Sequence, residues 1–371
     1  MARRLLIAGG GTGGHLFPGM AVAAEFQARD PENRVLFVGT LKGIEARLVP
    51  EAGYEFAAIR SRGIAGLGMT GKLKGLMALP LSLLDALRVV RRFKPHAALG
   101  VGGYVSGPAI LTARILGVPC AIHEQNAVPG FANRLLGRVV KKVFVSFDPA
   151  RAWFGGADRQ GRLVVTGNPA RRNIVEALLA RPEGQEPAGP EAPVRVLVVG
   201  GSQGAHGLNL LLLEAAVAMA ESERQRLLIR HQSGEKDLAL VEAGYGATGM
   251  RATVEPFIRD MASAYLEADL VVSRAGAGAV AEIALAGLPA LLVPYPHAAS
   301  DHQAANAAVL VDAGAAYLFR EGEANGKVVA AALLGLVNDP ARRREMAARA
   351  RSAARPRAAA EIVDQCVAMM V

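Results

Sequence analysis

Short apolar runs alternate with segments of helical periodicity along the whole chain. The apolar runs are residues 5–8, 34–38, 97–101, 119–122 and 142–146 in the first half, and residues 194–199, 226–231, 251–254, 270–273 and 290–293 in the second. They are almost continuously hydrophobic, which is typical of parallel strands covered on both faces. The pattern therefore predicts an α/β fold with two consecutive doubly wound, Rossmann-like domains.

The chain has 371 residues, which is too long for one ordinary core and favours two domains. Residues 181–193 are rich in proline and glycine and are predicted to form a linker. We expect one domain at residues 1–170 and the other at residues 190–344. The Ala- and Arg-rich tail that follows Ala341 has few helix breakers before Pro356 and is predicted to be helical.

The net charge of +9 is unevenly distributed. Residues 1–170 contain 22 Lys and Arg against 10 Asp and Glu, a net charge of +12, whereas residues 171–371 contain 20 against 23. A basic half is typical of proteins that bind nucleic acid or anionic membranes, and an ordinary solvated face explains it as well. Aromatic residues make up only 5% and no recognition motif is present, so we expect no nucleic acid partner. The two cysteines favour a reducing compartment.

Residues 67–84 combine many leucines with Lys72 and Lys74, and Arg60 and Arg62 precede them. An apolar patch with a basic rim is typical of a surface that seats on anionic lipid. An ordinary core helix explains the same residues and is, from this segment alone, the more common case. The uncharged residues 95–113 contain glycines and prolines, so they are predicted to form a strand and a loop and not a membrane span.

Two glycine-rich loops each follow an apolar run and precede a helical pattern, at residues 9–14 and 200–204. Glycines let backbone N–H groups approach a phosphate, and the helix N-terminus adds partial positive charge. Residues Gly9, Gly11 and Gly14 also fit G-x-G-x-x-G, but the second strand ends without an acidic residue. We therefore expect phosphate binding and no dinucleotide cofactor.

Two residues of the first half are candidates for acid–base chemistry. His15 directly follows the glycine loop, where a helix N-terminus favours a neutral imidazole that can act as a general base. Glu124 lies in a run of four polar residues, 123–126, after a predicted strand. It is either a second acid–base candidate or an orienting carboxylate. A helix-capping or packing role for His15 is the alternative.

In the second half, residues 273–282 again join a strand to a helix through small residues. This arrangement suits a diphosphate at the helix start, with Glu282 one turn later accepting hydrogen bonds from a ribose diol. A tight turn with a solvated glutamate explains the segment equally well. The chain has no Asp-x-Asp motif, so a nucleotide-sugar enzyme of this sequence is expected to use no divalent ion. Arg171 is the arginine best placed by sequence to neutralise a departing diphosphate.

Seven segments, residues 9–15, 102–108, 123–126, 167–171, 200–205, 276–282 and 301–306, occur in the order and spacing of one enzyme family. The chain resembles the bacterial peptidoglycan glycosyltransferases that add N-acetylglucosamine to undecaprenyl-diphosphate-N-acetylmuramoyl-pentapeptide, and the resemblance covers essentially the full length. It implies the two-Rossmann-domain (GT-B) architecture, with a cleft between the domains and a C-terminal helix, about residues 345–371, that returns to the first domain. It also implies an inverting transferase on the cytoplasmic face of the inner membrane, with the acceptor bound by the first domain and the donor by the second.

The resemblance also implies roles for individual residues. Thr12, Gly13 and Gly14 would line the donor side of the cleft, and Arg171 and Ser202 would contact phosphate. The Ile258 backbone would contact uracil. Further donor contacts would come from Asn126, Gln303, Ala277, Gly278, Ala279, Val280, Ala281 and Glu282. Ala275 and Ala279 stand where the family commonly has Ser and Thr, so side-chain hydrogen bonds to the diphosphate are expected to be fewer here.

The hypothesis is a metal-independent transfer from UDP-N-acetylglucosamine to the C4 hydroxyl of the lipid-linked acceptor, with His15 as general base and Glu124 as the reserve candidate. A membrane-bound acceptor makes lipid contact the favoured interpretation of residues 67–84. Expected partners are the donor, the undecaprenyl-linked acceptor, the anionic inner membrane, and cell-wall and division proteins. A UDP-N-acetylglucosamine epimerase and a non-catalytic nucleotide-sugar-binding scaffold are the alternatives.

Overall fold

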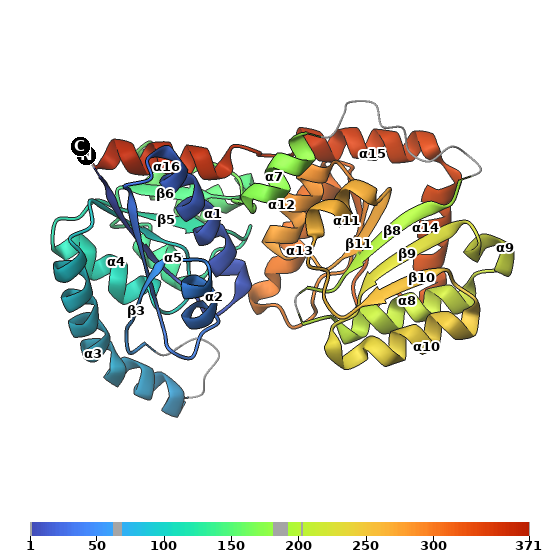
Figure 1. The fold of residues 1–371 in the computed structure, drawn as a ribbon, viewed down its shortest axis with the longest axis horizontal. Helices are drawn as coiled ribbons and strands as arrows, with labels where there is room; N and C mark the ends of the chain where they lie inside the picture. The colour runs from blue at the N-terminus through green and yellow to red at the C-terminus, as the bar shows by residue number, and fades with distance from the viewer. Residues whose placement is uncertain (1, 62–68, 181–191, 202, 371) are drawn as a thin grey trace. The chain divides into compact units, whose positions relative to one another are not determined.

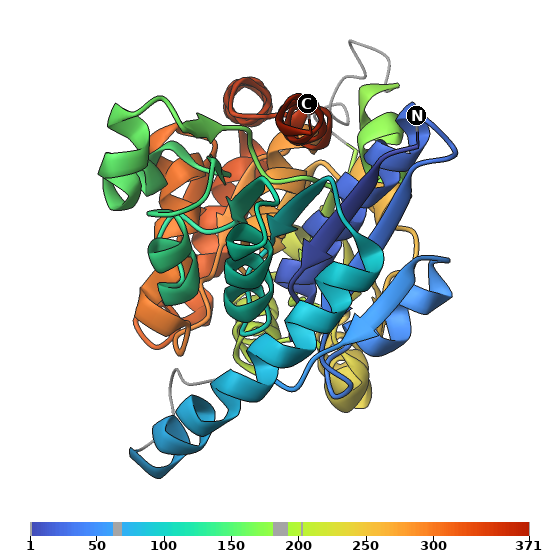
Figure 2. The same cartoon turned by 90° about the vertical axis from the view of Figure 1, so that its left-hand side faces the viewer.

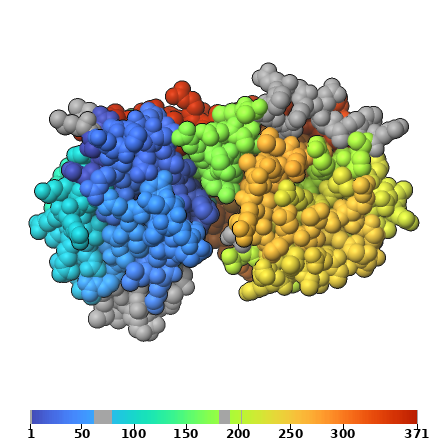
Figure 3. All heavy atoms as spheres, viewed as in Figure 1, coloured from blue at the N-terminus to red at the C-terminus, as the bar shows by residue number. Residues whose placement is uncertain are grey.

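The computed structural model describes residues 2–61, 69–180, 192–201 and 203–370, without the side chains of residues 69–78. The remaining residues are grey in the space-filling view (Figure 3). The chain divides into two compact units, each described by itself. Unit 1 consists of Met1–Arg172 with Arg355–Val371, and unit 2 consists of Asn173–Ala354.

Unit 1 contains a parallel sheet in the order β3-β2-β1-β4-β5-β6-β7 (Figure 1). The chain reverses its direction of strand addition between β1 and β4, which is the switch point where open α/β sheets bind ligands. The strands are β1 (Arg4–Ala8), β2 (Arg34–Gly39), β3 (Glu55–Ala58), β4 (Ala97–Gly100), β5 (Cys120–Glu124), β6 (Lys142–Val145) and β7 (Leu163–Val165).

Helices cover both faces of this sheet. Leu5 and Ile7 of β1 face α1 (Gly13–Arg29) and the C-terminal α16 (Ala358–Met369), which pack against each other. Leu6 and Ala8 face the opposite core, shared with α3 (Met69–Phe93) and α4 (Ser106–Ile115). Alternate side chains of one strand thus enter two cores, which explains the unbroken apolar runs. The N-terminal half of α3 extends beyond the sheet (Figures 1 and 2). The shorter helices are α2 (Glu45–Glu51), α5 (Phe131–Leu136), η1 (Asp148–Phe154) and α6 (Gly155–Arg159).

Unit 2 contains a second parallel sheet in the order β10-β9-β8-β11-β12-β13, with its switch point between β8 and β11. Its main core lies between the sheet and helices α8, α10 and α14. The strands are β8 (Val194–Val199), β9 (Leu227–Gln232), β10 (Ala252–Glu255), β11 (Leu270–Ser273), β12 (Ala290–Leu292) and β13 (Ala316–Leu318). The helices are α7 (Arg172–Leu179), α8 (His206–Ala218), α9 (Glu221–Arg224), η2 (Glu235–Asp237), α10 (Leu238–Thr248), α11 (Met261–Glu267), α12 (Ala277–Ala286), η3 (Ala299–Asp301), α13 (His302–Asp312), α14 (Gly326–Asn338) and α15 (Pro340–Ser352).

The predicted fold class is confirmed, and each of the ten predicted strands is present. Three strands were not predicted, β3, β7 and β13, and all three lie at sheet edges. Each has three or four residues, mostly half-buried, so it carries no long apolar run. The prediction of strand and loop for residues 95–113 was wrong in part, because α4 begins at Ser106. The predicted linker lies mostly at residues 181–191, outside the described part of the chain.

Candidate active site

In unit 1, two glycine-rich segments meet at the carboxyl ends of β1 and β4. A Cβ atom on Gly103 would lie 2.6 Å from the carbonyl oxygen of Gly10, so only glycine, here at φ +80°, permits this approach. The Ser106 hydroxyl holds the junction together: it donates to the Ala8 carbonyl (2.6 Å) and accepts from the Gly102 N–H (3.0 Å). The loop that follows β1 is therefore fixed in place by the loop that follows β4.

His15 lies in the first turn of α1, beside this junction. Its ring rests on Gly102, where an added Cβ would lie 2.6 Å from the ring Cδ2. Its Nδ1 is 3.2 Å from the hydroxyl oxygen of Thr12, the residue before the helix. Gly13 and Gly14 form the start of α1 itself. The structure thus places Thr12, Gly13, Gly14 and His15 together at the switch point of the sheet.

Glu45, which the sequence analysis did not single out, binds the backbone of the same loop. Its side chain is 1% exposed, and its carboxylate accepts hydrogen bonds from the Gly11 N–H (2.8 Å), the Thr40 N–H (2.9 Å) and the Thr40 hydroxyl (3.1 Å). Gly10, Gly39 and Gly43 pack against this carboxylate. One N–H group of the predicted phosphate loop is therefore already bound to an internal anion.

Glu124 is buried at the end of β5, and its carboxylate accepts four hydrogen bonds. The donors are the Asn126 N–H (2.9 Å) and side-chain amide (3.3 Å), the Gly130 N–H (3.1 Å) and the Asn133 amide (2.9 Å). Burial raises the pKa of Glu124, and these hydrogen bonds oppose that shift. Of the two roles left open by the sequence, this geometry favours the orienting carboxylate, which fixes Asn126 and the loop before α5.

A buried polar network connects β5 with the segment after β7. His123 accepts at Nδ1 from the Gln125 amide (3.1 Å), so we assign the ring proton to Nε2, which donates to the Gly167 carbonyl (3.2 Å). Burial lowers the pKa of His123 from 6.5 to about 4, so the ring is neutral. Gly167 begins the segment that ends in Arg171, whose guanidinium lies 5.9 Å from the ring centroid of Phe17 on α1. Arg171 thus belongs to unit 1, beside the helix that carries His15.

In unit 2, α12 begins directly after β11 at the switch point, and its N-cap residue, Gly276, supplies no capping side chain. Val280 is the first residue whose N–H bonds to Gly276, so the N–H groups of Ala277, Gly278 and Ala279 point out of the helix start. Such a terminus attracts anions. Glu282 lies one turn further along, and its carboxylate accepts from the Tyr265 hydroxyl (3.2 Å). Ala281 is half-buried, between the buried Val280 and the half-buried Glu282.

Two more residues that are predicted to bind the donor form hydrogen bonds with neighbouring residues. The Ile258 N–H, just after β10, donates to the Gln232 side chain (2.9 Å), and the Gln232 amide donates to the Gly201 carbonyl (2.7 Å). Gln303, in α13, accepts from the Tyr295 N–H (2.9 Å) through its side-chain oxygen. Both lie at the carboxyl edge of the sheet in unit 2. Ser202 lies outside the described residues.

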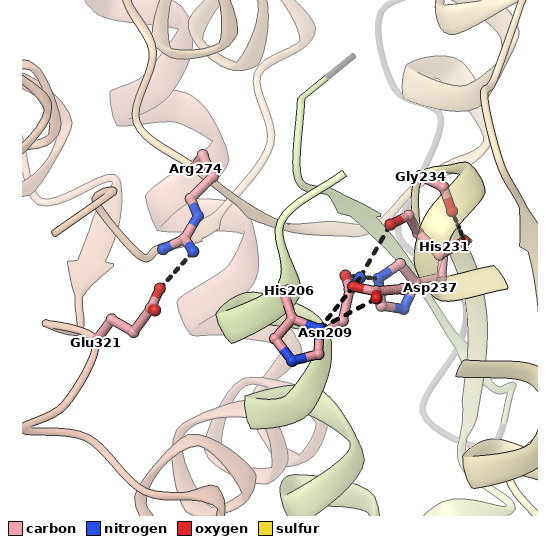
Figure 4. A network of polar contacts seen from close by, with 8 residues as sticks. His206, Asn209, His231, Gly234, Asp237, Arg274 and Glu321 are labelled. Atoms are coloured by element: carbon pink, nitrogen blue, oxygen red, sulfur yellow. Dashed lines mark hydrogen bonds and ion pairs between the residues drawn. The ribbon is translucent and has the colours of Figure 1, made fainter. Parts of the chain in front are cut away.

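Two carboxylates, those of Asp237 and Glu321, lie near the start of α8, which follows the second glycine loop (Figure 4). His206 Nδ1 is 3.0 Å from the Asp237 carboxylate, and the Asn209 amide donates to the same carboxylate (2.8 Å). Glu321 forms an ion pair with the buried Arg274 and packs against Gly207. The anion-attracting end of α8 thus already faces the Asp237 carboxylate, whereas the N-cap residue of α12 supplies no side chain.

Comparisons with known proteins identify the family of this chain. Residues 5–145 match the glycosyltransferase family 28 N-terminal domain, and residues 195–362 match the glycosyltransferase family 28 C-terminal domain. The chain belongs to glycosyltransferase family 28. A Myxococcus xanthus relative, named UDP-N-acetylglucosamine–N-acetylmuramyl-(pentapeptide) pyrophosphoryl-undecaprenol N-acetylglucosamine transferase, is 45% identical over 99% of this chain and 93% of its own length.

This family 28 glycosyltransferase is similar in fold to two solved structures. The Acinetobacter baumannii MurG structure is 35% identical, covers 99% of both chains and has a TM-score of 0.78. A UDP-GlcNAc 2-epimerase from Neisseria meningitidis, bound to UDP-GlcNAc, covers 99% of this chain and all of its own, at 13% identity and a TM-score of 0.68. The second likeness shows a shared fold only.

The structure therefore groups the predicted site residues by unit. Unit 1 holds Thr12, Gly13, Gly14, His15, Glu124, Asn126 and Arg171, and unit 2 holds Ile258, Gln303 and the residues from Ala277 to Glu282. Glu45, His123 and Arg274 were not predicted as parts of these sites. His123 lies within a segment that the resemblance used, but no local pattern marks Glu45, whose partners lie elsewhere in the chain.

Proposed function

We propose that this glycosyltransferase transfers N-acetylglucosamine from UDP-N-acetylglucosamine to the C4 hydroxyl of undecaprenyl-diphosphate-N-acetylmuramoyl-pentapeptide, in peptidoglycan synthesis. The observation that carries the proposal is the full-length similarity to a relative of that named activity. The likeness to an epimerase that binds UDP-GlcNAc, at 13% identity, supports only a shared fold and does not support epimerase activity. The reaction is inverting: the hydroxyl attacks the anomeric carbon from the face opposite UDP.

Unit 2 binds the donor in this proposal. The diphosphate lies at the start of α12, where the N–H groups of Ala277, Gly278 and Ala279 donate to it in place of a metal ion. Glu282 accepts from the ribose diol, the Ile258 backbone contacts uracil, and Gln303 contacts the sugar. Ser202 and Arg171 contact phosphate, and Asn126 completes the donor contacts. Because α8 already faces Asp237 and Glu321, α12 is the better diphosphate site of the two helices.

Unit 1 binds the acceptor and supplies the general base. If Nδ1–H of His15 donates to the Thr12 hydroxyl, Nε2 is the nitrogen that takes the proton from the acceptor hydroxyl. The departing UDP gains negative charge as the bond to the sugar breaks, and the Arg171 guanidinium neutralises it. In this proposal Glu124 orients Asn126 through its own hydrogen bonds and is the reserve candidate for the general base.

The enzyme reaches its acceptor from the cytoplasmic face of the inner membrane as a peripheral protein. None of the helices in the described ranges is long and apolar enough to cross a bilayer. Leu81 and Leu84 of α3 are exposed, and so is Ile115 of α4, which packs against α3. Arg88 and Arg114 lie on the same two helices and suit an anionic lipid surface. Contacts with cell-wall and division proteins remain predictions.

The decisive experiment measures transfer of labelled N-acetylglucosamine from the donor to a short-chain lipid acceptor, with and without a chelator. His15→Ala should lower kcat by about 10²–10⁴-fold and leave the Kd for UDP-N-acetylglucosamine nearly unchanged, because a general base acts only in the chemical step. Thr12→Ser, which keeps the hydroxyl beside Nδ1, is the matched control and should retain most of the activity. Near-normal turnover in His15→Ala would exclude His15 as the base.

The same assay separates the alternatives. An epimerase would change the donor sugar without any acceptor, and a scaffold would bind the donor and release no UDP when acceptor is added. A requirement for magnesium or manganese after chelation would contradict the role given to α12. Co-sedimentation with phosphatidylcholine vesicles, with and without phosphatidylglycerol, tests the membrane surface: Leu81→Ser/Leu84→Ser should weaken binding, and indifference to phosphatidylglycerol would contradict the proposal.

A further inference from the structure

The loop that joins β12 to α13, residues 293–301, ends in a strained turn. Ser300 has a φ of +54° and Asp301 a φ of +51°, and they are two of the three non-glycine residues with positive φ in the described part of the chain. Side chains other than glycine disfavour this left-handed region, so such residues persist only where neighbouring groups hold them. The loop leads directly into α13, whose second residue is Gln303, the proposed sugar contact.

Two consecutive residues of another segment hold this loop at both ends. Arg320, two residues after β13, forms an ion pair with Asp301 (2.9 Å) at the end of the loop. Glu321 forms an ion pair with the buried Arg274 (Figure 4), whose guanidinium donates to the carbonyls of residues 293 and 294 (3.1 Å each) at the start of the loop. Because a buried guanidinium depends on its counter-charge, the second link is firm.

Gln303 is tied to the same loop. Its side-chain oxygen accepts from the Tyr295 N–H (2.9 Å), which fixes the orientation of its amide group. A shift of the loop therefore shifts this amide. The proposed contacts with uracil and ribose come from other elements, Ile258 just after β10 and Glu282 in α12. Movement of the β12–α13 loop should thus affect binding of the sugar and not binding of the UDP moiety.

We propose that the Arg320–Glu321 segment positions the β12–α13 loop, and Gln303 with it, for the N-acetylglucosamine of the donor. This inference rests on the donor site proposed above and adds Arg320 as a positioning residue, which acts through Asp301. The Arg320–Asp301 pair is exposed, whereas the Arg274–Glu321 pair is mostly buried. Replacing Arg320 therefore releases the strained end of the loop and leaves the buried ion pair in place.

The test measures binding of UDP and of UDP-N-acetylglucosamine to the full-length protein by isothermal titration calorimetry. Arg320→Gln removes the ion pair at the strained turn. The matched control, Arg349→Gln, removes an ion pair of similar exposure, with Glu345 inside α15 (2.5 Å). We expect the Kd for UDP-N-acetylglucosamine to be about two- to fivefold higher in Arg320→Gln than in the control, because an exposed ion pair changes an equilibrium constant by about that factor. The Kd for UDP should be the same in both variants.

A second substitution tests the mechanism by rescue. Ser300 is exposed, and Ser300→Gly removes the cost of positive φ, so the loop should keep its conformation without the ion pair. Arg320→Gln/Ser300→Gly should therefore bind UDP-N-acetylglucosamine as tightly as Arg349→Gln does. Loss of affinity for UDP as well, or no rescue by Ser300→Gly, would contradict the proposal.

Gln303→Ala separates this inference from the function on which it rests. If Gln303→Ala weakens binding of UDP-N-acetylglucosamine and Arg320→Gln binds it as the control does, the inference alone fails. If neither variant weakens binding, the sugar contact in the proposed function fails as well. Failure of the transfer reaction itself is recognised separately, as an unmodified protein that binds UDP-N-acetylglucosamine and passes no sugar to the lipid-linked acceptor.

Discussion

Replacing Glu45 by Gln tests whether one buried carboxylate holds the first glycine loop in place. The carboxylate accepts three hydrogen bonds: one oxygen serves both donors of Thr40, and the other serves the Gly11 N–H. A glutamine has the same shape but only one oxygen. If that oxygen keeps the two Thr40 bonds, the amide nitrogen faces the Gly11 N–H, and two donors oppose each other.

The expected loss of stability follows from the number of hydrogen bonds that the glutamine can keep. One hydrogen bond to a charged group, worth about 1.5–3 kcal/mol, disappears, and a buried donor is left without an acceptor. The neutral side chain no longer requires burial of a charge, which offsets part of the loss. We therefore expect the free energy of unfolding of unit 1 to fall by about 2 kcal/mol.

The assay is urea unfolding followed by tryptophan fluorescence. The chain has a single tryptophan, Trp153 in unit 1, which lies under the guanidinium of Arg134 at 5.0 Å and is 47% exposed. Its emission therefore reports on unit 1. The control is Glu51→Gln on the same helix, where the carboxylate is exposed and, among the described residues, pairs with Arg47 alone (3.1 Å), so a change under about 0.5 kcal/mol is expected. If Glu45→Gln were as stable as Glu51→Gln, the carboxylate would not hold the loop.

Three further predictions concern pH and the substrate contacts. Burial lowers the pKa of His231 from 6.5 to about 4, so as the pH falls the unfolded state binds a proton at a higher pH than the native state does. The free energy of unfolding of unit 2 should therefore fall by about 2 kcal/mol between about pH 7 and pH 5. His231→Gln should flatten this pH dependence, measured by urea unfolding followed by circular dichroism. Glu282→Gln should raise the KM for UDP-N-acetylglucosamine by about 10–100-fold, because the ribose diol loses a charged hydrogen-bond acceptor. The control Glu267→Gln, at an exposed residue paired with Arg230, should leave the KM unchanged. Equal KM values for the two variants would show that Glu282 does not bind the ribose. Arg171→Lys keeps the charge but loses the two-pronged geometry, so single-turnover UDP release should slow by about tenfold, and an unchanged rate would show that Arg171 does not contact the diphosphate.

Local sequence was sufficient for the central strands and for the position of each glycine loop. Residues 5–8 are apolar without interruption because both faces of β1 are buried, Leu5 and Ile7 in one core and Leu6 and Ala8 in the other. The same reasoning failed at β3, β7 and β13, three of the four edge strands, since an edge strand is paired on one side only and these three are short and partly exposed. It also failed at α4, where Gly107 and Pro108 fall in the first turn, a position that tolerates both.

The sequence by itself determined two doubly wound domains and the ends of the strands at which functional side chains occur. Only the tertiary structure decided which of these groups are available to a substrate. The Gly11 N–H is bound by a carboxylate 34 residues away, and the start of α8 is bordered by Asp237 and Glu321, whereas the start of α12 has no capping side chain. Apolar periodicity is a local property because burial of one strand constrains consecutive residues. Hydrogen-bond pairing is not local, since it depends on which distant loops the fold brings to the same edge of a sheet.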